Sequence, residues 1–500
     1  MNILDRKSSE KRLKKAIKQN RDTQARTYYR RARWGVIGLF LLLCLLSLNY
    51  NGPFFDEGIY VTAGVRTLEP STYRDGFLTW FAGSLAWPIL AGFSYLVGGI
   101  MGMRVMAVLL GTISLTAVGR SARNIFDEKV GFWTTLAFAL NGPFLALSRL
   151  GVYDILALTG IAISFWALTE VTRQDHRFWL IVAVIAYVLA IFAKYPTGLM
   201  VVPLLGTLYF LRKNKAITDI TIFLFLAGAI GLTFFLPARE QIGSFFNWRL
   251  ENRPEFGVPL SVIGFALLYL NAAPFLLAVW GWVRAEGRRD LGALLLLCLG
   301  IWPTYHLLAG DPVGPNKHVV FGFLFVYPLI GVALSKMWDN KKRAWLRKGV
   351  TILLLLGLGG LGMIQVNQSD NGWPDVRPPA GVLLSLVEPG DQLLINESWP
   401  FTMYLYTADR IDSPWDVYDA YRVTHEDDTP SLCTYDWFVD VRGSYTWPEE
   451  IQEELEQCNT YQRIYSHTSM VINLGEDFNY VRYPVETVVW ENTRERAQRE

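Results

Sequence analysis

The chain has 500 residues, of which 51% are hydrophobic and 18% are charged. A soluble globular protein carries roughly 25% charged residues, so the composition excludes an ordinary soluble enzyme. The net charge of +2 hides three unlike parts. Residues 1–33 carry a net charge of +9, residues 34–364 carry another +9, and residues 365–500 carry −16. This uneven distribution also excludes an evenly basic protein that binds nucleic acid.

The middle part consists of apolar runs separated by short charged loops, which is typical of a protein that crosses a membrane many times. The basic residues before Trp34 predict a cytoplasmic N-terminus, because lysine and arginine are enriched on that side. The apolar runs lie at about 35–50, 84–101, 103–119, 130–147, 155–171, 178–193, 197–211, 219–237, 259–283, 291–308, 319–335 and 349–364.

The positive-inside rule selects which of these runs cross. The basic loops at 120–129, 173–177, 212–215, 284–289 and 336–348 all face the cytoplasm only if the run 84–101 does not cross. Pro88, Gly92, Gly98 and Gly99 interrupt that run and Gly83 directly precedes it, so we expect a membrane-surface or re-entrant helix within a long first outer loop. We therefore predict an all-α polytopic membrane protein with about eleven transmembrane helices.

Three parts follow from this count. They are a basic cytoplasmic tail (1–34), a transmembrane domain (35–364) and a small extracytoplasmic α/β domain (365–500), in a protein of the plasma membrane. Strand-like segments at 392–396, 437–441 and 469–473 and helical segments near 376–387 and 448–457 predict the α/β character of the last part. Cys433 and Cys458 would lie in an oxidising space, where either a disulfide or two free thiols fit the sequence.

Charged residues at the outer ends of the predicted spans are candidates for a functional site. A charge near hydrocarbon costs free energy, so its presence there indicates a function or a structural partner. Adjacent carboxylates can bind a metal or act as a general base, and nearby cations can hold a phosphate. A structural use of each residue also stays open, as a helix cap or an interfacial charge. The candidates are Asp56, Glu57, Arg66, Arg74, Asp75, Arg149, Asp154, Lys194, His306, Asp311, Lys317 and His318.

Four segments, in order, resemble a known family. They are Asn51–Tyr60, which contains Asp56-Glu57; the span from Arg104 to Gly119; Arg149–Leu156, which contains Asp154; and Lys194–Gly198, which reads Lys-Tyr-Pro-Thr-Gly. The chain resembles the polyprenyl-phosphate-sugar-dependent (C-type) membrane glycosyltransferases, such as the dolichyl-phosphate-mannose protein mannosyltransferases and the aminoarabinose transferases. The resemblance covers about residues 35–340 and implies membrane-surface helices in the first outer loop.

The resemblance implies an inverting hexosyl or pentosyl transferase. In that reading Asp56 is the general base, Glu57 positions a substrate, and Asp154 is a second carboxylate. Lys194, Arg149, Lys317 and His318 would bind the lipid phosphate. The implied partners are a polyprenyl-phosphate sugar donor, membrane lipids and a glycan, lipid or protein acceptor of the cell envelope, with no nucleic acid. We expect no cofactor and no metal site. Some members of the family need a divalent cation beside these acids and others do not, so a divalent cation stays open.

Two points remain open in the sequence. The first outer loop reads Leu85-Ala-Trp-Pro88 where many family members have Lys-Pro-Pro or His-Pro-Pro, so the donor sugar and the acceptor are not determined. Two alternative functions stay open. One is a transporter or flippase of lipid-linked sugars, and the other is a scaffold protein whose function lies in its outer domain. A transporter is expected to place ionisable residues near mid-membrane within two related halves, and the sequence lacks such a pairing.

Overall fold

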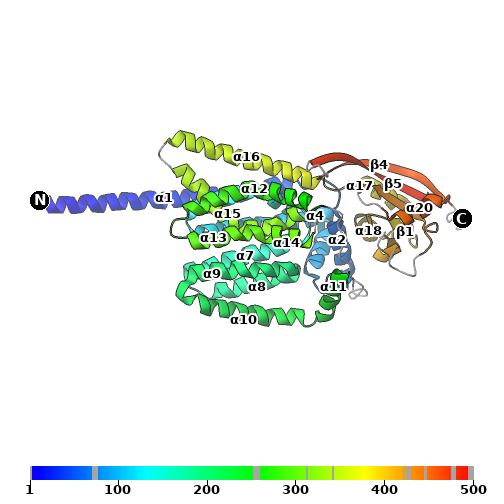
Figure 1. The fold of residues 1–500 in the computed structure, drawn as a ribbon, viewed down its shortest axis with the longest axis horizontal. Helices are drawn as coiled ribbons and strands as arrows, with labels where there is room; N and C mark the ends of the chain where they lie inside the picture. Colours follow the sequence, from blue (N-terminus) through cyan, green and yellow to red (C-terminus); the bar gives the residue numbers. More distant parts are fainter. Residues whose placement is uncertain are drawn as a thin grey trace.

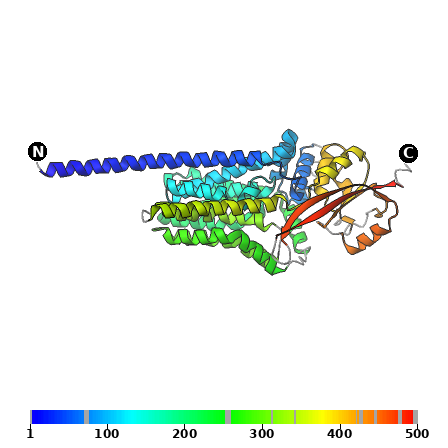
Figure 2. The same cartoon turned by 90° about the horizontal axis from the view of Figure 1, so that it is seen from above.

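The computed structural model describes residues 3–69, 77–251, 259–310, 314–339, 343–419, 422–423, 430–443, 447–474 and 480–493. A bundle of roughly parallel helices carries a smaller sheet-containing domain at one end, and the N-terminal helix extends beyond the other end (Figures 1 and 2). This architecture agrees with the predicted all-α membrane domain and small C-terminal α/β domain.

The helical part contains α1 (Ile3–Leu46), α2 (Phe55–Leu68), α3 (Phe77–Trp80), α4 (Ala86–Ile125), α5 (Glu128–Ala139), α6 (Gly142–Leu147), α7 (Tyr153–Gln174), α8 (Phe178–Ala193), α9 (Val201–Arg212), α10 (Ala216–Phe235), α11 (Arg239–Glu251), α12 (Leu260–Arg284), α13 (Arg289–Leu297), α14 (Ile301–Ala309), α15 (Pro315–Asp339) and α16 (Ala344–Asp370). Short 3₁₀ turns join several of them, at Tyr195–Met200, Lys213–Lys215 and Cys298–Gly300.

In the described part of the chain, seven helical segments are long and apolar enough to cross a membrane. They include Pro315–Asp339, which lies in the middle of the bundle, and Tyr195–Phe235, which joins α9 and α10. The apolar helix α8 is shorter than these segments. The structure therefore supports a polytopic protein, while the count of eleven spans stays a prediction.

The run 84–101 forms the first part of α4, and the helix bends where that run ends. Gly98 and Gly99 depart from helical geometry, and Gly99 has a φ of 61° and a ψ of −157°. Only glycine adopts this backbone conformation readily. The bend separates a segment that packs along α2 from a segment that enters the bundle.

Both ends of this first segment lie at the end of the bundle that carries the C-terminal domain. The indole Nε1 of Trp87 donates to the carbonyl of Gly151, just before α7. The Tyr95 hydroxyl is 3.0 Å from Thr407 Oγ1, which belongs to the C-terminal domain. A segment that begins and ends at one end of the bundle does not traverse it. This arrangement supports the prediction that the run 84–101 does not cross.

Ion pairs connect the five basic loops at the opposite end of the bundle. Because each pair joins two different connections, all five loops lie close together there, as the positive-inside argument requires. The pairs are Arg123–Glu170, Arg212–Asp175, Lys129–Asp339 and Lys336–Glu286.

The C-terminal domain is built on a five-stranded sheet with the order β2-β1-β3-β5-β4. Strands β1 and β2 pair in parallel, β1 and β3 pair in parallel, and β5 runs antiparallel to both β3 and β4. Its elements are α17 (Arg377–Leu386), β1 (Leu393–Ile395), α18 (Ser398–Thr407), β2 (Val417–Tyr418), β3 (Trp437–Arg442), α20 (Glu449–Gln457), β4 (Tyr461–Leu474) and β5 (Tyr480–Asn492). The predicted strands and helices are present, whereas α18, β2 and β5 were not predicted.

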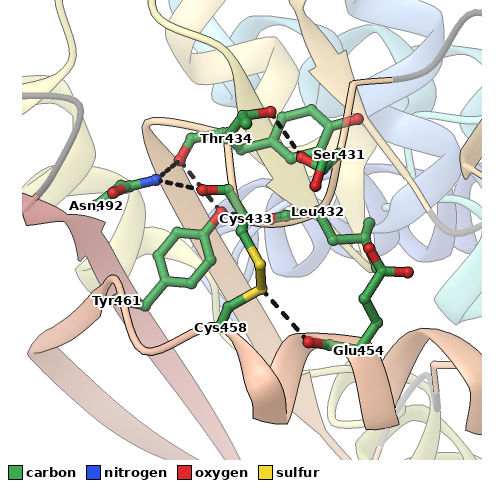
Figure 3. The surroundings of a disulfide bond; sticks show 9 residues. Ser431, Leu432, Cys433, Thr434, Glu454, Cys458, Tyr461 and Asn492 are labelled. Carbon is green, nitrogen blue, oxygen red and sulfur yellow. Dashed lines mark hydrogen bonds between the residues drawn. A yellow bond between two sulfur atoms is a disulfide. The ribbon is translucent and has the colours of Figure 1, made fainter.

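Cys433 and Cys458 form a disulfide with a Cα–Cα distance of 5.4 Å, which resolves the alternative that the sequence left open. Figure 3 shows the bond linking the loop before β3 to the end of α20, beside the Tyr461 ring. The Tyr461 hydroxyl donates to the carbonyl of Leu432. Disulfides persist in oxidising compartments, so this bond fits a domain outside the cytoplasm.

Candidate functional site

Asp56 lies in the first turn of α2, at the end of the bundle that carries the C-terminal domain. The helix begins after Pro53, and the backbone N–H of Phe54 donates to the Glu57 carboxylate over 2.9 Å, which caps the N-terminus. Two acids in the first turn also complement the positive end of the helix dipole. The Asp56 side chain is 27% exposed, so the predicted base remains accessible.

Glu57 is fully buried and pairs with Arg104 of α4, which is also fully buried. Arg104 Nε and Nη2 donate to the two Glu57 oxygens over 3.0 and 2.7 Å. The remaining Arg104 donors reach the carbonyls of Leu48, Asn51 and Gly52. This pair therefore fixes the segment that leads from α1 to Asp56.

Glu57 also holds the second acid-bearing segment, because the N–H of Gly151 donates to its Oε1 over 2.9 Å. Gly151 lies just before α7, whose first turn contains Asp154. The resemblance implies that Glu57 positions a substrate. Its burial and its four hydrogen bonds instead indicate a positioning role for the loops that carry Asp56 and Asp154.

Asp154, Lys194 and His318 meet at the same end of the bundle although they come from α7, the end of α8 and α15. Lys194 donates to Asp154 Oδ1 and contacts His318 Nε2. Asp154 Oδ1 lies 3.6 Å from His318 Nε2. Among the residues that the structure describes, the second oxygen of Asp154 is buried and has no hydrogen-bond partner. A buried oxygen of this kind is costly and is suited to a substrate hydroxyl.

His306 of α14 extends this chain of contacts. His306 Nε2 lies 2.9 Å from His318 Nδ1, and His306 is fully buried. A charged Lys194 can only donate, so the His318 Nε2 that it contacts must accept. The His318 proton is then on Nδ1 and is donated to His306. Two neutral histidines in fixed tautomers thus support the Lys194 ammonium.

Asp56 forms an ion pair with Lys317, the residue before His318. Lys317 Nζ donates to Asp56 Oδ2 over 2.7 Å and lies 5.1 Å from the centre of the Phe54 ring. Five predicted site residues therefore form two adjacent carboxylate–cation clusters at the ends of α2, α7, α8 and α15. One cluster is Asp56 with Lys317, and the other is Asp154 with Lys194 and His318.

Arg149 lies outside these two clusters. Its guanidinium donates to both oxygens of Asp370, at the end of α16, over 2.7 and 2.8 Å. The side chain is only 5% exposed and is occupied by this pair, so we no longer assign it to the phosphate. α16 ends at Asp370 and thus extends past the predicted domain boundary at residue 364.

Tyr60 lies one turn after Asp56 and is buried against Tyr153, with 5.1 Å between the ring centres. Burial raises the pKa of Tyr60 well above its usual range, and the charges of Asp56 and Asp154 raise it further. The phenol therefore stays neutral and keeps its proton as a hydrogen-bond donor near both carboxylates.

The C-terminal domain contacts α2 directly next to Asp56. A Cβ added to Gly58 would lie 2.6 Å from the backbone carbonyl of Trp399 and 2.8 Å from the nitrogen of Pro400. Only glycine permits this approach of α18 to α2. Sequence reasoning missed Trp399, and it treated Arg104 only as the start of a span. A buried arginine at the end of an apolar run was the available signal.

Arg74, Asp75 and Asp311 lie outside the described residues. Among the residues that the structure does describe, no group of three or more histidines, cysteines or acids is placed to hold a metal ion. Around Asp56 and Asp154, the positions nearest the carboxylate oxygens are occupied by the amines of Lys317 and Lys194.

Comparisons with known proteins agree with this picture. The family model described as dolichyl-phosphate-mannose-protein mannosyltransferase matches residues 85–239. No curated protein sequence matches the chain. ArnT from Cupriavidus metallidurans in the apo state has a similar structure, with a TM-score of 0.56 at 13% identity over 91% of this chain and 97% of that chain.

Two further structures share the fold. The Archaeoglobus fulgidus oligosaccharyltransferase in the apo form gives a TM-score of 0.55 at 12% identity, over 90% of this chain and 74% of that chain. Arabinofuranosyltransferase AftD from Mycobacteria gives a TM-score of 0.54 at 14% identity, over 93% of this chain and 40% of that chain. The family match and the fold confirm that the chain resembles the C-type, polyprenyl-phosphate-sugar-dependent membrane glycosyltransferases.

Proposed function

We propose that the protein is an inverting glycosyltransferase that moves a hexose or pentose from a polyprenyl-phosphate donor to an extracytoplasmic acceptor of the cell envelope. The observation that carries the proposal is the pair of clusters Asp56–Lys317 and Asp154–Lys194–His318 at one end of the bundle. ArnT from Cupriavidus metallidurans has been crystallised with undecaprenyl phosphate, which supports a donor of this class.

In the proposed reaction, Asp56 takes the proton of an acceptor hydroxyl or amine as that group attacks the anomeric carbon. A new bond forms on one face of the sugar, and the bond to the phosphate oxygen breaks on the other. The electron pair leaves with polyprenyl phosphate. Lys194 and Lys317 stabilise the negative charge that develops there, and the free oxygen of Asp154 orients a hydroxyl of the sugar.

We propose that this reaction needs no metal ion. The amines of Lys317 and Lys194 supply positive charge beside the two carboxylates. A divalent cation would supply the same positive charge. Asp56, Asp154 and hydroxyl groups of the donor are the oxygen ligands that a divalent cation would use. Such an ion would have to displace both amines.

The proposed orientation places the C-terminal domain and the site outside the cytoplasm of the plasma membrane. The cluster of basic loops at the opposite end supports this orientation, as does the disulfide. A cysteine introduced at Ser413, whose side chain lies in the C-terminal domain, is expected to react with a membrane-impermeant maleimide in whole cells.

The decisive test is a transfer assay with purified protein in lipid. It offers a panel of labelled polyprenyl-phosphate sugars with an envelope extract as acceptor, and it compares the wild type with Asp56→Asn. We expect transfer from one donor, lost by at least a hundredfold in the variant, since a general base contributes about 10²–10⁴. Asp412→Asn, an exposed aspartate of the outer domain, is the matched control and is expected to retain transfer.

A transporter of lipid-linked sugars is the alternative function. It predicts that Asp56→Asn leaves movement of the lipid across the bilayer intact and that no donor is turned over. Transfer that survives in Asp56→Asn would retain the enzyme class and move the base to Asp154.

A further inference from the structure

A charged hollow lies at the end of the bundle opposite the proposed reaction site. It has a volume of about 340 Å³ and forms between the turn that joins α7 to α8 and the turn that joins α9 to α10. Figure 1 shows both helix pairs turning at the end away from the C-terminal domain. The lining residues are Asp175, Arg177, Arg212, Asn214, Lys215 and Thr218.

The charge of this hollow is positive. Three cations, Arg177, Arg212 and Lys215, line it together with one carboxylate, Asp175. Hydrogen bonds from Lys215 and Arg212 lower the pKa of Asp175 to about 2, so this carboxylate is ionised at physiological pH. Asp219 also pairs with Arg212 and with Arg177, so the three cations and the two carboxylates leave a net charge of +1. The buried Asp219 lies behind this lining and holds Arg212 Nε over 2.7 Å.

Asp175 therefore acts as an organiser of the cations. It accepts from Arg212 Nη1 over 2.6 Å and from Lys215 Nζ over 2.7 Å. These bonds gather two basic side chains from the α9–α10 turn against the α7–α8 turn. Basic side chains held in this way are preorganised for an anion, which lowers the entropy that binding costs.

Neutral donors complete the lining. Asn214 supplies a side-chain amide and Thr218 a hydroxyl, and both are exposed. The Asn214 amide and the Thr218 hydroxyl can donate to an anion beside the cations. Together these groups are suited to the oxygens of a phosphate.

The position of the hollow indicates that this phosphate belongs to a lipid. Phe178 directly follows Arg177 and is 55% exposed, and Ile217 lies in the first turn of α10 and is 69% exposed. Exposed apolar side chains at the start of two membrane-type helices mark the boundary between headgroups and hydrocarbon. A headgroup in the hollow would leave its acyl chains along Phe178 and Ile217.

We propose that this hollow is a binding site for the phosphate headgroup of an anionic phospholipid. The proposal does not depend on the glycosyltransferase activity, because the hollow lies at the opposite end of the bundle. A free phosphate ion shares the headgroup chemistry, but it would make no use of the exposed apolar flank.

The test is native mass spectrometry of the purified full chain titrated with phosphatidylglycerol and, separately, with phosphatidylcholine. The test variant is Arg177→Gln/Lys215→Gln. The control is Arg284→Gln/Arg289→Gln, which removes the same charge from another loop at the same end. Loss of a charge-assisted hydrogen bond to a bound phosphate costs about tenfold in affinity, so we expect phosphatidylglycerol affinity to fall at least about tenfold in the test variant. In the control it is expected to change by less than about twofold, because Arg284 and Arg289 do not line the hollow.

Equal losses in the two variants would overturn the proposal, because they would indicate unspecific attraction to surface charge. Binding of phosphatidylcholine as strong as that of phosphatidylglycerol would also overturn it. Inorganic phosphate at millimolar concentration is the third arm. Displacement of the lipid by it would assign the hollow to a soluble phosphate, whereas unchanged lipid binding supports the assignment to a phospholipid.

Discussion

The buried pair between Glu57 and Arg104 gives the sharpest prediction, through the substitution Glu57→Gln. The carboxylate accepts two bonds from Arg104, one from Phe54 and one from Gly151. Glutamine keeps one oxygen and turns the other into a donor, which would face a donor already present. The substitution also leaves the Arg104 charge buried without its counter-ion.

Removing one partner of a buried ion pair costs about 3–5 kcal/mol, and we expect that loss in the free energy of unfolding. We also expect slower transfer, because both acid-bearing segments lose their common anchor. A displacement of about 1 Å in a reacting geometry costs roughly a hundredfold in rate. The measurements are urea unfolding in lipid and the kcat and KM of sugar transfer.

Glu69→Gln is the matched control, because Glu69 directly follows the same helix and its side chain is 44% exposed. Such a change is expected to alter stability by less than about 1 kcal/mol. The positioning role of Glu57 is wrong if Glu57→Gln raises only the KM for a substrate and unfolds like the wild type. That result would return Glu57 to direct substrate contact, as the sequence suggested.

Three further predictions concern the site and the outer domain. His306→Leu removes the hydrogen-bond acceptor of His318, so we expect the KM for the donor to rise about tenfold with a smaller change in kcat. His306→Gln is expected to restore the KM. A wild-type KM in His306→Leu would refute the idea that the two histidines hold Lys194 in place. The double substitution Cys433→Ser/Cys458→Ser opens a loop of 25 residues and is expected to cost about 3.5 kcal/mol on the loop-entropy estimate, measured by chemical unfolding with and without reductant; equal stability of both forms would contradict this. A chelator is expected to leave the transfer rate within about twofold, and a loss reversed by one divalent cation would show that the amines do not replace a metal.

The position of the site was predictable because it follows from counting charges and crossings. The charge and crossing count alone places Asp56, Asp154, Lys194 and Lys317 at one membrane face, and the structure brings them together. Runs of lysine and arginine determine sidedness over many residues. An error of a few residues at a helix end therefore does not move a side chain to the other face.

The partners of each charge were not predictable in the same way. Glu57 and Asp56 are adjacent, yet one is fully buried and the other is 27% exposed. This difference depends on the direction in which each side chain leaves α2 and on Arg104, which lies 47 residues away. Long-range pairs leave no periodic trace in the sequence. The same reason explains why Arg149 was assigned to phosphate when its partner is Asp370.

The distribution of ion pairs favours transfer over transport. In the described part of the chain, the ion pairs of the bundle lie at its two ends: those of Asp56, Glu57 and Asp154 at one, those of Glu170 and Asp175 at the other. A transporter places its ionisable residues at mid-membrane, where they meet the substrate from either side in turn. Here the carboxylates and the amines lie at a single end of the bundle, next to Arg104 and the C-terminal domain. Such a site fits the proposed donor, a lipid whose reactive phosphate stays at that face while its tail remains in the bilayer.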